Sequence, residues 1–233
     1  MIAVGRLLAV ALCVMAPLVA GCTSTPFLSE TVEDAWAFDR VEDLPDAGPL
    51  NDVTLAEALT QRRSARDFTT DPLTVEQAAA LLWAAQGMTA PWGGRTAPSA
   101  GALYALDVYL VTADGIRHYL PDGHRAQVRD SVTALAAVAD AVGQDSAASA
   151  PTLLVITGTP DRLKPKYLLR AERYTYMEAG HAAQNVLLAA TALGLGGVPI
   201  GSFDQADAAG ALGLPDGAEP IYVIPIGVPA TDA

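Results

Sequence analysis

Three arginines and one serine gather in the segment Arg62-Arg63-Ser64-Ala65-Arg66, although the whole chain has only 14 lysines and arginines. Two guanidinium groups and a hydroxyl donor suit a phosphate dianion, because guanidinium forks pair with its oxygens bidentately. Arg62 and Arg66 stand four residues apart, so they converge if the preceding helix continues through both. The alternative is that these arginines cover surface near a helix C-terminus and interact with its dipole.

Two other segments are rich in small residues, whose backbone amides can come close to a ligand. The first, Pro98-Ser99-Ala100-Gly101-Ala102-Leu103-Tyr104, stands directly before an expected strand. The second contains Pro199-Ile200-Gly201-Ser202, where the amides of Gly201 and Ser202 could face a planar ring. This is not a dinucleotide fingerprint, since Pro199 takes the place of the third glycine and the segment follows a helix. A plain turn is the alternative for each segment.

A polar helix face is expected within the run from Arg173 to His181. Tyr174, Glu178 and His181 fall roughly on one side of a helix, which would line a pocket or a dimer seam. The alternative is a histidine with only a structural role. The chain contains neither a Gly-x-Ser-x-Gly elbow nor a Gly-Lys-Ser/Thr phosphate loop, which argues against an α/β-hydrolase and a P-loop enzyme. Nothing in the sequence indicates a metal site.

The N-terminus has the pattern of an export signal. Arg6 is followed by an apolar run from Leu7 to Ala20, which is too short to span a bilayer as a helix. Val19-Ala20-Gly21-Cys22 resembles the lipobox of bacterial lipoproteins, which implies cleavage before Cys22 and a lipid on its thiol. An ordinary signal peptide with an incidental cysteine is the alternative. The chain is therefore expected to be an exported protein on the outer side of a bacterial membrane, anchored through Cys22.

Composition limits the remaining possibilities. The chain of 233 residues is 51% hydrophobic and carries a formal net charge of −12, which makes nucleic-acid binding improbable. Apart from Cys22, the only cysteine is Cys13, inside the expected signal, so neither a disulfide framework nor a cysteine nucleophile is indicated. The prediction is a signal peptide over residues 1–21, an extended or partly disordered acidic tether over 22–53, and one compact domain over 54–233.

The patterns within this domain predict alternating helices and strands. Two capping boxes, at Thr54 and Thr74, open helices, and Gly87 stops the second as a C′ residue. Further helices are expected over residues 125–142, 166–193 and 205–212, and strands over 106–112, 116–120, 152–157, 198–203 and 220–226. The hairpin at residues 106–120 favours an α+β fold with a mixed sheet over a purely parallel α/β fold.

Taken together and in order, these segments resemble the FMN-dependent nitroreductase superfamily, and most closely its branch of azoline-forming peptide dehydrogenases, which includes the oxidase of the streptolysin-S type. The resemblance covers about residues 44 to 229. The matching segments are Leu44-Pro45, Arg62 to Phe68, Leu73-Thr74, Leu81 to Gly87, Pro98 to Tyr104, Glu178 to Asn185, and Pro199-Ile200-Gly201.

The resemblance implies a cofactor and an assembly. FMN would be bound with its phosphate on Arg62, Arg63, Ser64 and Arg66, its ribityl chain and ring edge along Pro98, Ser99, Ala100 and Gly101, and its isoalloxazine beside Pro199, Ile200, Gly201 and Ser202. A backbone amide near N5 would favour the reduced flavin. The family is usually a homodimer with FMN at the subunit interface, and the long helix would lie in that seam.

Two departures from the family pattern bear on activity. The azoline dehydrogenases carry a lysine–tyrosine pair as base, and the corresponding pair in this chain is Arg173-Tyr174, where arginine is a poor proton acceptor. Ala102 stands where typical nitroreductases have asparagine, and the chain ends without a late cation. The expected function is a ping-pong, two-electron FMN oxidoreductase acting on a small molecule or peptide. The alternative is a lipoprotein that keeps the scaffold as a binding module without chemistry.

Overall fold

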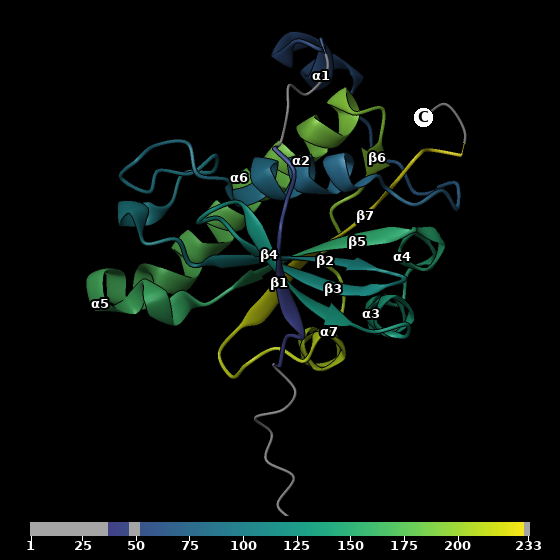
Figure 1. The fold of residues 1–233 in the computed structure, drawn as a ribbon. Helices are drawn as coiled ribbons and strands as arrows, with labels where there is room; N and C mark the ends of the chain where they lie inside the picture. Colours follow the sequence, from purple (N-terminus) through teal and green to yellow (C-terminus); the bar gives the residue numbers. More distant parts are fainter. Residues whose placement is uncertain (1–36, 47–51, 231–233) are drawn as a thin grey trace, which may run out of the picture. The chain divides into compact units, whose positions relative to one another are not determined.

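A central β-sheet organises the chain, seen in a computed structural model that describes residues 37–46 and 52–230 (Figure 1). Among the described residues it has seven strands in the order β1-β4-β3-β2-β5-β7-β6, and each pair of neighbours is antiparallel. The strands are β1 (Arg40–Asp43), β2 (Leu106–Thr112), β3 (Gly115–Leu120), β4 (Arg125–Asp130), β5 (Thr152–Gly158), β6 (Gly196–Gly197) and β7 (Glu219–Gly227).

The antiparallel pairing of the strands confirms the α+β class, and helices cover both faces of the sheet. In Figure 1, α2 (Val75–Gln86) and α6 (Ala171–Ala192) lie above the strands, and α3 (Ala134–Val142) and α7 (Gln205–Leu212) lie below. The alternation of β5 divides its side chains between the two layers: Leu154 and Ile156 pack with α2 and α6, whereas Leu153 and Val155 pack with α3. The remaining helices are α1 (Leu55–Gln61), α4 (Asp145–Ser149) and α5 (Lys164–Tyr167), with short 3₁₀ turns at Ala100–Ala102, Pro160–Arg162 and Leu168–Arg170.

Both predicted capping boxes are formed. The Thr54 amide donates to Glu57 Oε2 at 2.8 Å, and the Glu57 amide donates to Thr54 Oγ1 at 3.2 Å. Thr74 and Gln77 make the same reciprocal pair at the start of α2. Gly87 ends α2 with extended dihedral angles rather than the expected left-handed ones. A Cβ there would lie 2.2 Å from the indole of Trp83, so the glycine is needed for close approach.

The prediction of one helix over residues 125–142 is wrong in its first half. Residues 125–130 form β4, because Ala126 and Val128 alternate with polar residues and bury their side chains in the sheet. The helix α3 begins only at Ala134. Here the period-two pattern outweighed the helical preference of an alanine-rich segment.

The predicted long helix over residues 166–193 is present as α6, but it begins at Ala171. Leu168 adopts φ +50° and ψ −123°, a positive-φ conformation that interrupts the helical run and separates α5 from α6. The predicted strand over residues 198–203 is not formed as such: β6 is only Gly196–Gly197, and beyond it Ile200 alone bridges to Val223. The strands predicted over 106–112, 116–120, 152–157 and 220–226 and the helix over 205–212 are confirmed.

The chain joins the sheet earlier than the predicted tether allows. Residues 40–43, assigned to the tether from composition, form β1 and pair with β4 along the sheet edge. Arg40 Nη1 lies 2.6 Å from Asp130 Oδ2 and holds the end of this pairing. No helix among the described residues is both long and apolar enough to cross a membrane. Cys22 and the predicted signal lie outside the described residues.

Candidate functional site

The arginine segment lies against the short strand β6. Ser64 bridges Gly197 in parallel, and the Ala65 amide donates to the Gly197 carbonyl at 3.3 Å. A Cβ on Gly196 would approach the Ala65 Cβ to 2.5 Å, so this contact requires glycine. The structure therefore brings two of the predicted segments together, although they are far apart in sequence.

The arginines are presented by an extended chain, not by a helix face. α1 ends at Gln61, and Arg62 has φ −53° and ψ 121°. Ser64 and Arg66 are exposed, Arg62 is partly buried and Ala65 is buried. Since alternate residues of an extended segment share a face, we expect Arg62, Ser64 and Arg66 to face one way. Arg63 Nη1 instead donates to the carbonyls of Thr60 and Arg62, at 2.8 and 2.9 Å. Arg63 thus caps the end of α1, which leaves two arginines and one serine for an anion.

The turn at residues 98–104 is strained and close-packed. Gly101 has φ +63°, and Ala102 and Tyr104 also adopt positive φ values of 53° and 50°. A Cβ on Gly101 would lie 2.7 Å from Lys166 Nζ and 2.8 Å from the Tyr167 hydroxyl. Strain of this kind is concentrated at functional sites.

A pocket of about 260 Å³ joins this turn to the polar face of α6. It is lined by Pro98, Ser99, Ala100, Tyr174, Met177, Glu178 and His181. The predicted grouping of Tyr174, Glu178 and His181 on one helix face is therefore confirmed. Arg173 does not line this pocket but a neighbouring surface hollow with Leu169 and Tyr176.

One carboxyl group ties the turn to α6. Glu178 is 1% exposed, and its Oε2 accepts a hydrogen bond from Ser99 Oγ at 2.6 Å and from the Ala105 amide at 3.5 Å. Burial raises the pKa of Glu178, against the lowering effect of the hydrogen bonds from Ser99 and Ala105. Glu178 is therefore the buried acid of this candidate site.

Lys166 and Tyr167 are functional candidates that the sequence reasoning missed. Both reach Gly101, and the Tyr167 ring packs edge-on against Tyr174 with centroids 5.0 Å apart. The signal for these two residues was that they form an adjacent lysine–tyrosine pair shortly before α6. The family's lysine–tyrosine pair was instead matched to Arg173-Tyr174. The approach of Lys166 and Tyr167 to Gly101 depends on the break at Leu168, which lets α5 fold back over the turn at residues 98–104.

The segment Pro199 to Ser202 runs beside β7. Ile200 exchanges two backbone hydrogen bonds with Val223, at 2.9 and 3.0 Å. Gly201 and Ser202 follow on the exposed side, and within the described part of the chain neither of their amides donates to a backbone carbonyl. Their binding to a ligand stays a prediction.

The predicted site residues form two clusters in a single chain. The first contains Arg62–Arg66 beside Gly197, just beyond the C-terminal end of α6, and Ile200 to Ser202 continue from it along β7. The second surrounds Ser99 and contacts α6 at Glu178. The helix rise of 1.5 Å per residue places Glu178 roughly 22 Å from Leu193 along the axis. One chain therefore does not gather both clusters around a single small pocket.

Comparison with known proteins agrees with this architecture. The Nitroreductase family profile matches residues 59–228. A protein of Methanocaldococcus jannaschii named as a nitroreductase is 35% identical over 191 residues, which span 79% of this chain and 94% of that protein. The crystal structure of a nitroreductase from Ralstonia eutropha superposes with a TM-score of 0.75 and 31% identity, covering 83% of this chain and 91% of that one.

A more distant match shows the same fold. The NADPH:FMN oxidoreductase of Vibrio harveyi, solved with NAD⁺, superposes with a TM-score of 0.58 at 24% identity, over 76% of this chain and 70% of that one. The profile match covers most of the chain and includes the arginine segment, the strained turn, α6 and β6. On these grounds the chain belongs to the nitroreductase family.

Proposed function

We propose that this protein is an FMN-dependent oxidoreductase that transfers two electrons, as hydride, by a ping-pong mechanism. The observation that carries the proposal is the extended Arg62-Ser64-Arg66 face beside Gly197. Within the described residues Arg62 and Arg66 make no ion pair, so both guanidinium groups are available to a phosphate dianion. The neighbouring amides of Gly201 and Ser202 suit the flavin ring.

The chain's own residues would bind and orient the cofactor. FMN, when bound, supplies hydride exchange at its ring, and the protein sets the potential by hydrogen bonds to the ring. Pro98, Ser99 and Ala100 would line the ring edge, and Lys166 and Tyr167 would cover it. Tyr174 remains a candidate proton donor from α6, whereas Lys166 is a better candidate than Arg173 for the basic partner because it reaches the strained turn.

Flavin content tests this function. Residues 23–233, purified after expression with FMN, should be yellow and should release FMN on denaturation. Arg62→Ala and Arg66→Ala should each weaken FMN binding about 10- to 100-fold, since a charged hydrogen bond contributes about 1.5–3 kcal/mol. Arg40→Ala, which removes an exposed arginine on β1, is the matched control. A folded but colourless protein that takes up no FMN would favour the binding-module alternative.

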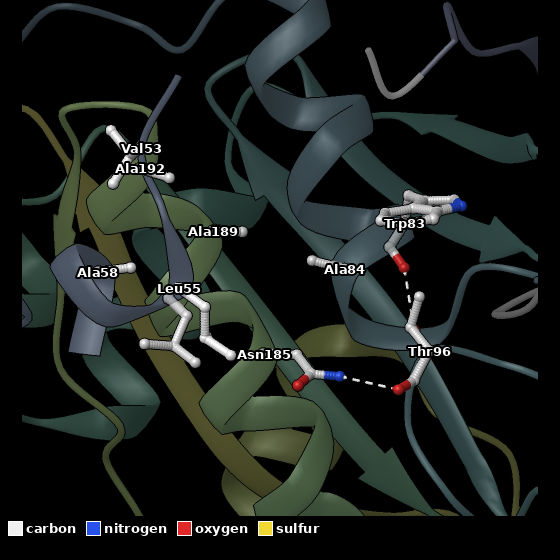
Figure 2. Close-up of a pocket in the computed structure, with 10 residues that line it drawn as sticks. Val53, Leu55, Ala58, Trp83, Ala84, Thr96, Asn185, Ala189 and Ala192 are labelled. Atoms are coloured by element: carbon white, nitrogen blue, oxygen red, sulfur yellow. Dashed lines mark hydrogen bonds between the residues drawn. The ribbon is translucent and has the colours of Figure 1, made fainter. Parts of the chain in front are cut away.

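We also propose a homodimer whose subunits share each flavin. Glu178, beside the Ser99 turn, lies roughly 22 Å along α6 from Leu193, near which the arginines lie, so we expect a second copy to bring its Ser99 turn beside the arginines of the first. Apolar surface near α1 supports this assembly: Leu55 and Leu59 are 66% and 55% exposed. An adjoining hollow between α1, α2 and α6 has a volume of about 270 Å³. Figure 2 shows residues that line it, with Asn185 donating to the Thr96 carbonyl.

Export and lipid attachment at Cys22 complete the proposal. In an exported location NAD(P)H is not reliably supplied, so we propose another reductant for the cofactor and a small molecule or peptide as the second substrate. Labelling with a clickable fatty acid in a bacterial host tests the anchor. Cys22→Ser should abolish the label, while Cys13→Ser should retain it; retained label in Cys22→Ser would contradict the anchor.

A further inference from the structure

The hydroxyl of Ser99 has one hydrogen-bonding position left on the pocket side. Ser99 Oγ lies 2.6 Å from Glu178 Oε2, and one of these two groups donates a hydrogen bond to the other. Ser99 Oγ also accepts a hydrogen bond from the Tyr104 amide at 2.9 Å. A hydroxyl has one proton and two lone pairs. One lone pair is therefore free when Ser99 donates to Glu178, and the proton itself is free when Glu178 donates to Ser99.

Glu178 is poorly stabilised as an anion. Of the buried side-chain nitrogen and oxygen atoms in the described residues, Glu178 Oε1 and Gln86 Nε2 lack a hydrogen-bond partner, and Gln86 nevertheless lies close enough to lower the pKa of Glu178 in part. A buried carboxylate with an unsatisfied oxygen is costly, and protonation lowers that cost. The groups facing it are Gln86, Arg95, Ser99 and the Ala105 amide, with Tyr174 and His181 on the same pocket wall.

We propose that Ser99 and Glu178 form a proton-transfer pair for the pocket, in which Ser99 touches the ligand and Glu178 exchanges the proton behind it. When a substrate is reduced, the Ser99 O–H bond breaks toward the substrate as the Glu178 proton passes to Ser99 Oγ, and Glu178 becomes a carboxylate. The reverse step accepts a proton from a substrate being oxidised. No electrons move in this step, because the electron pair belongs to the cofactor of the proposed function, on which the inference rests.

The proton on Glu178 can be observed without flavin. Infrared spectra of the apo protein, recorded across pH, should show a protonated carboxylic acid band that persists above the range of ordinary glutamates. Glu178→Gln should remove this band, while Glu172→Gln, an exposed glutamate on the same helix, should retain it. Ser99→Ala should shift the band, because the acid loses its partner. Identical spectra for the wild type and Glu178→Gln would overturn the proposal.

A pair of acceptors tests the transfer in the FMN-loaded enzyme. Reoxidation of the reduced holoenzyme by 1,4-benzoquinone requires a proton at the acceptor, whereas reoxidation by ferricyanide does not. Glu178→Gln should slow the quinone reaction about 100-fold, within the range of general acid catalysis, and should slow the ferricyanide reaction far less. Wild type should also lose rate as rising pH ionises Glu178, and Glu178→Gln should lack this limb.

The outcomes separate the two proposals. Equal slowing with both acceptors, or no slowing with either, would overturn the proton-transfer pair and assign Glu178 a purely structural role. If the wild type retains no FMN, the proposed function fails, and the infrared test on the apo protein still decides whether Glu178 holds a proton. Glu178→Asp provides a second variant that keeps a carboxyl group and should restore part of the pH limb.

Discussion

At the scale of single residues, the backbone of Leu168 carries a cost that the side chain does not recover. The residue has φ +50°, and its side chain is 73% exposed. Leu168→Gly should therefore raise the free energy of unfolding by about 1 kcal/mol, because glycine adopts this conformation without strain. Leu169→Gly is the control: Leu169 is 101% exposed in a helical turn, and the change should lower stability. Equal losses for both variants in urea denaturation would contradict the argument.

Asp107 links stability to acid. Burial alone raises its pKa, but His118, whose Nε2 lies 3.2 Å away, and Arg162, which donates at 2.6 Å, outweigh burial and hold the pKa below its usual value. A lowered pKa gives stability that is present above the unfolded value, near pH 4, and is lost as pH falls through the folded value. Asp107→Asn should cost about 2 kcal/mol at pH 7. Chemical denaturation should show this gap closing as pH falls below about 4; a constant gap would refute the linkage.

At the scale of elements, α6 contains a glycine that no contact with the described residues requires. A Cβ at Gly180 meets no atom within 4 Å, and the same holds for Gly210 in α7. Both Gly→Ala changes should stabilise the protein by about 0.5–1 kcal/mol in thermal unfolding at low protein concentration. If a second subunit packs closely on α6, only Gly180→Ala should weaken the dimer. Loss of stability in the Gly210→Ala control would contradict the helix argument.

Local signals predicted the elements that local chemistry controls. The capping boxes at Thr54 and Thr74 set helix starts, and strands with a clear apolar pattern were recognised. Residues 125–130 were missed because the alanines that follow them favour a helix, whereas the segment pairs with the preceding strand β3 as a hairpin and with the distant β1. The break at Leu168 has no local signal, since leucine ordinarily avoids positive φ.

The candidate site was predicted in its parts but not in its arrangement. The arginine segment was identified by residue type, yet its extended conformation and the capping role of Arg63 depend on contacts with β6 and α1. The contact of Lys166 with Gly101 depends on how α5 folds back. Spacing in sequence does not encode these tertiary relations.

At the scale of the whole molecule, the exposed leucines of α1 make the assembly testable. Leu55→Glu and Leu59→Glu place charge on the surface that the proposed dimer buries, so both should shift the protein toward monomer in analytical ultracentrifugation. Val132→Glu introduces the same charge at a valine that is 88% exposed near α3, and it should leave the assembly unchanged. FMN should be lost together with the dimer. A variant that is monomeric yet retains flavin would argue against a shared site.

The pairing of β1 with β4 limits how far the domain could lie from a membrane anchor at Cys22. The chain pairs with the sheet from Arg40 onward, so a lipid on Cys22 would leave residues 23–39 as the tether. A fully extended segment of this length spans at most about 60 Å. A tether of this length would give the proposed site a high effective concentration toward molecules dissolved in the bilayer. It would give no such gain toward molecules that diffuse freely in solution. The domain would then stay within a thin layer next to the membrane, where it would meet membrane-soluble electron carriers most often.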